Sequence, residues 1–116
     1  MASLIPMTEL PAGFSYPKEY LRIMELELTN LEPWWLMDGD ILFRIYNGLA
    51  KRYPEDRFVP FAKREDNDDI ACWDLAAGNI VIVHDFADPG RHRRGMFKDF
   101  YTWFRQAIED LIEFDS

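Results

Sequence analysis

The sequence contains a single cysteine, Cys72, among 116 residues. Because one cysteine cannot form an intramolecular disulfide, a reducing compartment is the simpler expectation. Nowhere do about 18 apolar residues stand together, which is the length that a membrane-spanning helix needs. The N-terminus lacks a basic segment followed by a long apolar run, so no secretory signal is indicated. These absences predict a cytoplasmic domain that folds on its hydrophobic core alone.

Basic residues are scarce: 13 lysines and arginines face 21 aspartates and glutamates, which gives a formal net charge of −8. Nucleic acids and anionic membranes are bound through Lys and Arg, so this balance argues against both as partners. An acidic protein suits a basic protein partner, although negative charge also serves solubility alone. The hydrophobic content of 48% is sufficient for the core of one domain over residues 1–116.

Three short strands joined by two turns are predicted between residues 58 and 86. The runs 70–75 and 80–86 are rich in β-branched and aromatic residues, and the Ala-Ala-Gly-Asn sequence between them suits a tight hairpin. The earlier turn, 63–69, is strongly acidic. Strands with apolar residues on both faces must be covered, so this β-meander is expected at the centre of the domain.

The clearest helical pattern spans residues 96–113, where apolar residues recur at three- and four-residue spacing. Its apolar stripe comprises Phe97, Phe100, Tyr101, Phe104, Ile108 and Leu111. Opposite it lie mostly polar and charged residues. This helix is expected to close one face of the sheet.

Two further helices are predicted before the meander. The first follows Ser15 as its N-cap and enters through Pro17. Its predicted buried stripe consists of Tyr20, Leu21, Met24 and Leu28. The second begins at Asp38 or Asp40 and ends before Pro54, and residues 34–37 are expected to form a short strand. The predicted fold class is α+β, an antiparallel sheet with helices packed mainly on one face.

An ordered set of motifs in the second half of the chain resembles the SUKH superfamily of Smi/Knr-type domains. The set consists of a Val-Pro-Phe-Ala strand (59–62), an acidic turn closing on Asp-Asp-Ile-Ala-Cys-Trp-Asp (68–74), a Gly-Asn turn (78–79), a Val-x-Val-His-Asp-Phe strand (81–86) and a Phe-x-x-Phe-x-x-Trp-Phe helix (97–104). The resemblance extends from Trp34 to Phe114. That superfamily groups bacterial toxin-immunity proteins with fungal cell-wall regulators.

The resemblance implies a non-enzymatic domain that binds a protein through one face of its sheet and the adjoining loops. Carried onto this sequence, that surface comprises Asp66, Asp68, Asp69, Trp73, His84 and Asp85, with Trp34 or Trp35 at the rim. The implied partner is a basic toxin, with a nuclease as the natural target, because carboxylates offer oxygens to Arg and Lys. A regulatory scaffold that recruits cellular proteins is the alternative.

Catalytic and metal sites are the remaining alternatives. Cys72, His84 and Asp85 are the residue types of a nucleophilic site, but a thiol inside a packed strand lacks the cationic neighbours that lower its pKa. A small metal-dependent hydrolase needs more ligands than His84 and His92 supply with the nearby acids. The acidic turn lacks the glycine and distant glutamate of a calcium-binding EF-hand loop. The sequence therefore predicts no enzyme activity, no metal and no cofactor.

One basic segment, residues 89–95, precedes the last predicted helix and contains three arginines. Arginine side chains bind phosphate or carboxylate groups well. In a chain this acidic, the segment is expected to be a loop that balances nearby carboxylates.

Overall fold

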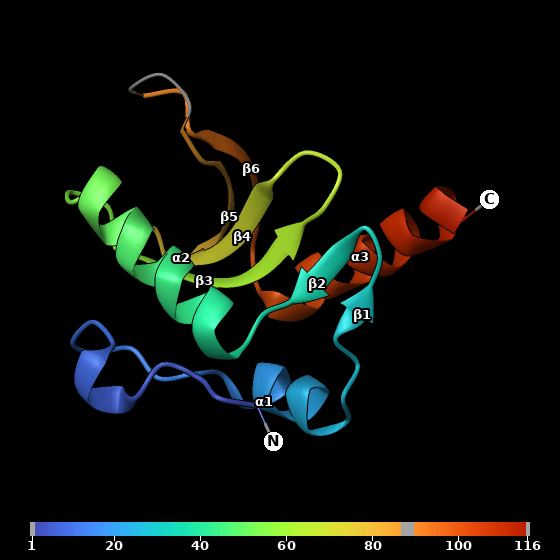
Figure 1. Ribbon diagram of the computed structural model, residues 1–116, viewed down its shortest axis with the longest axis horizontal. Helices are drawn as coiled ribbons and strands as arrows, with labels where there is room; N and C mark the ends of the chain where they lie inside the picture. The colour runs from blue at the N-terminus through green and yellow to red at the C-terminus, as the bar shows by residue number, and fades with distance from the viewer. Residues whose placement is uncertain (1, 87–89, 116) are drawn as a thin grey trace.

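A six-stranded antiparallel sheet runs through the middle of the molecule (Figure 1). The computed structural model describes residues 2–86 and 90–115. The strands are β1 (Asn30–Leu31), β2 (Trp34–Leu36), β3 (Phe58–Arg64), β4 (Asp69–Asp74), β5 (Asn79–His84) and β6 (Arg93–Phe97). They lie in sequence order, and each pairs with the next. The predicted α+β fold is confirmed, as are the three strands of the central meander and the short strand that begins at Trp34.

Helices lie against both faces of the sheet (Figure 1). They are a 3₁₀ turn η1 (Met7–Glu9) and the α-helices α1 (Lys18–Glu25), α2 (Gly39–Arg52) and α3 (Phe100–Asp115). On one face, Tyr20 of α1 and Trp103 of α3 contact Phe61 of β3. On the other face, Tyr53 at the end of α2 contacts Phe58 of the same strand. The expectation of helices mainly on one face therefore describes α1 and α3 but not α2.

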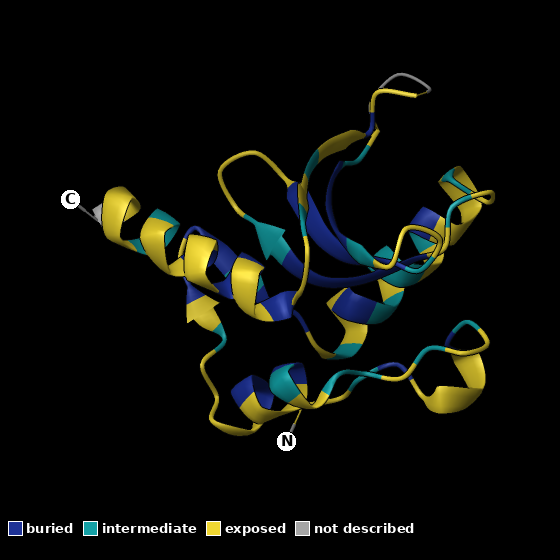
Figure 2. Ribbon diagram, turned by 180° about the vertical axis from the view of Figure 1, so that it is seen from behind, coloured by how far each residue is buried: buried dark blue, intermediate teal, exposed yellow. Residues whose placement is uncertain are grey.

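The centre of the sheet is buried on both sides (Figure 2). All six residues of β4 are buried, and Tyr20 of α1 and Phe100 of α3 pack on Trp73 of this strand. A register shift between Pro60 and Ala62 leaves Phe61 as an extra residue in β3, and its ring packs among Trp73, Phe100 and Trp103. This aromatic cluster provides the rigid base for the surface loops.

The first helix is shorter than its sequence pattern predicts. It begins at Lys18, with Pro17 rather than Ser15 as N-cap, and it ends at Glu25. Tyr20 and Met24 are buried as expected, together with Ile23, which was not in the predicted stripe. Leu21 and Leu28 are instead 43% and 45% exposed. The prediction that these two leucines are buried is wrong, and their side chains form exposed apolar surface.

The segment before the last helix is also different from its prediction. Residues 93–97 form strand β6, and α3 begins only at Phe100. The strand was missed because its arginines and glycine do not have a strand-like pattern, and pairing with β5 decides its conformation. The helix buries Phe100, Trp103, Phe104 and Ala107, while Tyr101 and Ile108 are exposed. Pro89, part of the predicted loop, lies outside the described residues.

Candidate protein-binding site

The exposed acids of the predicted site are neutralised within the chain. Asp66, in the turn between β3 and β4, accepts hydrogen bonds from Arg64 at 2.6 and 3.2 Å. Asp68 is paired with Lys63 at 2.8 Å. These hydrogen bonds hold the pKa values of both carboxyl groups below their usual range. A partner that binds this turn must therefore compete with Arg64 and Lys63.

Of the two remaining acids of the predicted site, Asp69 is buried and Asp85 is half-buried, and both are paired. Asp69 lies 2.9 Å from Nδ1 of His84, directly opposite it on the neighbouring strand. Asp85 accepts two hydrogen bonds from Arg52 at the end of α2. Both pairs join separate elements of the fold, so they position the ends of the strands.

The three tryptophans of the predicted site differ in accessibility. Trp73 is 8% exposed and packs against Tyr20 and Phe61, so its burial argues against a direct contact with a partner. Trp34 is 4% exposed and donates a hydrogen bond from Nε1 to Asp110 at 3.0 Å. Trp35 is half-buried and lines a surface pocket. Of the three, Trp35 alone offers a ring wall at the surface.

The pocket beside Trp35 has a volume of about 330 Å³. Its apolar wall includes Ile41 of α2, which is 39% exposed, and its rim carries Glu65 and Lys63. Lys63 is the one basic residue among the described residues that line it, and Asp68 already neutralises it.

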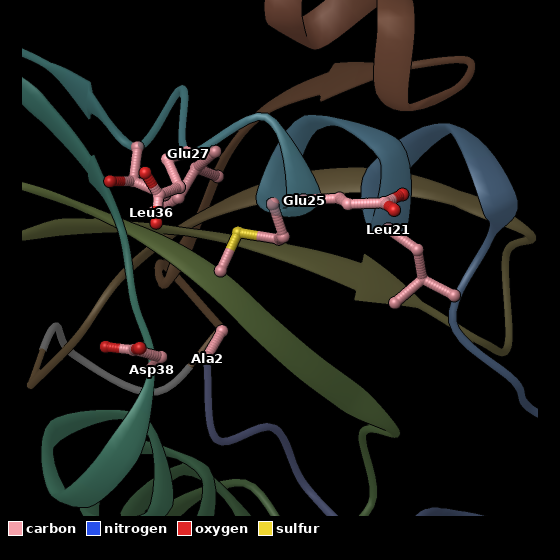
Figure 3. Close-up of a pocket in the computed structure, with 8 residues that line it drawn as sticks. Ala2, Leu21, Glu25, Glu27, Leu36 and Asp38 are labelled. Atoms are coloured by element: carbon pink, nitrogen blue, oxygen red, sulfur yellow. The ribbon is translucent and has the colours of Figure 1, made fainter.

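A larger pocket of about 640 Å³ adjoins it and shares Leu36 and Asp38 with it (Figure 3). Figure 3 shows that this pocket brings together side chains from α1, from the segment after α1 and from β2. Leu21 forms an apolar wall, and Glu25 and Glu27 supply carboxylates. We call the two pockets together the acidic groove. The groove has four lining carboxylates, Glu25, Glu27, Asp38 and Glu65, none of which is in an ion pair within residues 2–86 and 90–115.

None of these four acids belongs to the binding surface predicted from the sequence, although Glu65 lies in the acidic turn beside it. Glu25 is the last residue of α1, Glu27 lies just after this helix, and Asp38 is the N-cap of α2. The sequence around each of them therefore indicates a helix end and not a binding site. The available signal was the leucine-glutamate alternation of residues 25–28, which does not match a buried helical stripe. Only the folded structure shows that the acids of α1, of the segment after it and of the α2 N-cap line one groove.

Glu27 occupies a backbone conformation that normally favours glycine. Its φ is 59°, and it follows the C-cap residue Leu26 of α1. The next residue, Leu28, donates its N–H to the carbonyl of Ile23 at 3.2 Å, which completes a Schellman motif. Glycine is common at this position because it has no Cβ to oppose a positive φ. A glutamate here keeps a carboxylate at the groove at some cost in stability.

Replacing Glu27 with glycine is expected to stabilise the fold by about 1 kcal/mol, or about 3 to 6 °C in melting temperature, because the left-handed strain is removed. The same change at Glu25, the last helical residue, is expected to destabilise by about 1 kcal/mol, because glycine is a poor helix former. Thermal unfolding of the two variants and the wild type checks this. Equal effects of the two substitutions would contradict the strain at Glu27.

Residues of the alternative catalytic and metal sites are separated or buried. Cys72 is fully buried, and this burial raises the pKa of its thiol well above the usual value. Among the described residues, no three His, Cys, Asp or Glu side chains form a group that could hold a metal ion. His84 and Asp85 are engaged with Asp69 and Arg52, respectively. None of the helices in the described part of the chain is long and apolar enough to span a membrane.

A cluster of charged residues lies at the C-terminal end of α2, away from the acidic groove. Asp56 accepts a hydrogen bond from Arg93 at 2.6 Å and is 2.9 Å from Nε2 of His92. Burial opposes ionisation of Asp56, but the hydrogen bonds from Arg93 and His92 outweigh it and lower the pKa of Asp56. The His92 ring stacks on Tyr53 with centroids 4.2 Å apart.

The lowered pKa of Asp56 predicts a pH-dependent contribution to stability. A carboxyl group whose pKa is lower in the folded state stabilises the fold above its unfolded pKa of about 3.9, and this contribution is lost as the pH falls through the folded value. We expect Asp56→Asn to lower stability at pH 7 by no more than about 1 kcal/mol, since the group is partly solvated. Denaturant unfolding from pH 7 to pH 2.5 should show the two proteins converge in acid. A constant difference over that range would contradict the assignment.

The chain matches no protein-family model, no curated protein and no solved structure.

Proposed function

We propose that this protein is a non-enzymatic, protein-binding domain whose acidic groove holds a basic partner. We further propose, from the resemblance to the SUKH superfamily, that it is a bacterial immunity protein that neutralises a toxin in the cytoplasm. The observation that carries the proposal is the groove itself: two adjoining pockets with apolar walls and four carboxylates that have no partner in the described structure.

The composition of the groove suits side chains that combine an apolar stem with a positive charge. Arg and Lys have this character, since their stems pack on apolar surface while their heads remain polar. Leu21 and Ile41 supply exposed apolar surface, and Glu25 and Glu27 supply carboxylates beside it. A guanidinium group that enters such a site gains charge-assisted hydrogen bonds.

This charge pattern also supports a nuclease as the toxin. The substrate of a nuclease is anionic, so its binding surface must carry Lys and Arg. An acidic domain that covers this surface competes with the nucleic acid and is drawn toward it by long-range attraction. The predicted site and the acidic groove share Trp35, which lines the second pocket together with Lys63 and Glu65 of the acidic turn.

The test is a groove variant, Glu25→Gln, Glu27→Gln and Asp38→Asn, which removes charge with little change in shape. Its matched control, Glu9→Gln, Glu32→Gln and Glu55→Gln, makes the same change in net charge at exposed acids that do not line the groove. Affinity capture from the source cells with wild type, groove variant and control should identify a basic protein that only the groove variant fails to retain.

The identified protein is then produced in a bacterial host together with each version of the domain. We expect wild type and control to restore growth and the groove variant to fail. Equal retention and equal protection by all three versions would refute the groove as the binding site. A retained partner that is not toxic would refute the immunity function and favour the scaffold alternative.

A further inference from the structure

The two edges of the sheet are unequal. β1, at one edge, has two residues, whereas β6, at the other edge, has five. Within the described residues β6 pairs only with β5, so its outer side is an unpaired strand edge. Arg93, Arg94 and Met96 are exposed, and Met96 is 70% exposed. Unpaired strand edges carry free N–H and C=O groups that can pair with another strand.

The charge around this edge is opposite to that of the whole molecule. Arg91, Arg94, Lys98 and Arg105 are exposed and form no ion pair within the described residues. We call β6 together with these four residues the basic edge. The nearby Asp99 uses its carboxylate to accept hydrogen bonds from the N–H and hydroxyl of Thr102. The basic edge therefore carries positive charge although the formal net charge of the whole protein is −8.

A hollow of about 460 Å³ lies beside this strand, between Phe97 and the outer flank of α3. Ile108, which is 37% exposed, forms its apolar wall, and Arg105 lies at its margin. In strand addition, main-chain hydrogen bonds supply affinity, and pockets for alternate side chains supply specificity. The hollow can accept an apolar side chain of an added strand, and Arg105, which lines it together with Glu109, can pair with an acidic side chain next to it.

We propose that the basic edge binds an extended acidic segment of a protein, which adds to the sheet as a further strand beside β6. This surface is separate from the acidic groove, and the inference does not depend on the proposed function. A second copy of β6 fits poorly, because the sequence Arg-Arg-Gly-Met-Phe supplies no carboxylate to pair with the arginines. An acidic segment neutralises the same residues.

The test uses a synthetic peptide of about eight residues, the length of an ordinary strand, in which glutamate alternates with valine. Calorimetry should show that it binds the intact protein at least about tenfold more tightly than a peptide that alternates lysine with valine. An edge variant, Arg94→Glu and Lys98→Glu, should lose binding by a similar factor. The matched control, Arg22→Glu and Arg44→Glu, makes the same charge change on α1 and α2 and should leave binding unchanged.

A third peptide keeps the glutamate-valine sequence but carries N-methyl groups on alternate backbone nitrogens, which removes hydrogen-bond donors without changing charge. We expect it to bind at least about tenfold more weakly, and we expect the unmodified peptide to slow amide exchange in β6. Equal affinity of the two peptides would overturn strand addition. Absence of binding by the acidic peptide, tighter binding of a single-stranded RNA, or self-association through β6 would likewise overturn the proposal.

Discussion

Replacing Trp73 with alanine is expected to lower the free energy of unfolding by about 3 to 5 kcal/mol, the usual cost of removing a large buried aromatic side chain. The Trp73 ring contacts those of Phe14, Tyr20 and Phe61 at centroid distances of 5.4, 4.9 and 4.5 Å. Its removal leaves a cavity between β4 and α1 that the surrounding rings cannot fill. Urea or thermal unfolding measures the loss directly.

Trp35→Ala is the matched control for this experiment. Trp35 is half-buried and lines the acidic groove, so its removal should cost less stability than removal of Trp73 and should weaken partner binding. The comparison of the two variants thus separates an effect on core stability from an effect on the proposed contact surface. If Trp73→Ala were as stable as Trp35→Ala, the aromatic cluster would not be the centre of the core.

Arg93→Leu is expected to cost about 3 to 5 kcal/mol, because it leaves the carboxylate of Asp74 buried without its cationic partner. Asp74 is 1% exposed and is paired with Arg93, which also binds Asp56. The second oxygen of Asp74 accepts hydrogen bonds from the N–H groups of Ala76 and Ala77 in the β4–β5 turn. Loss of the arginine therefore disturbs both the sheet and this turn.

A double-mutant cycle separates the buried charge from the lost packing of Arg93 on Phe58. Asp74→Asn retains an oxygen for the turn but removes the charge. The double variant Arg93→Leu, Asp74→Asn should accordingly be more stable than Arg93→Leu alone. If the second substitution brought no recovery, the loss would come from packing rather than from an unpaired charge.

The fold was largely predictable because its signals are local. The β-branched strands, the Gly-Asn turn and the apolar spacing around Phe100 each indicate an element within a short window, and the structure contains those elements. The exceptions have non-local causes. β6 is a strand because it pairs with β5, and Leu28 falls outside the buried stripe of α1 because the helix ends at Glu25.

The candidate site was less predictable, because charge in the sequence does not reveal pairing in space. The acidic turn is conspicuous in the sequence, yet Arg64 and Lys63 at the end of β3 neutralise Asp66 and Asp68. The acids of the groove are conversely inconspicuous, since Glu25 and Asp38 are 13 positions apart in the sequence and line one pocket only in the folded structure. A residue-type search finds carboxylates, whereas only the structure shows which ones lack a partner.

The most direct test of the proposed groove is the rate at which the purified basic partner associates with wild type, with the groove variant and with a turn variant, Asp66→Asn, Asp68→Asn and Asp69→Asn. At low salt we expect the groove variant to associate at least about tenfold more slowly than wild type, and this difference should shrink as salt screens the field. The turn variant should be less affected, because its acids are already paired. A groove variant that associates at the wild-type rate at low salt, with the turn variant slowed instead, would contradict the account and return the contact surface to the acidic turn.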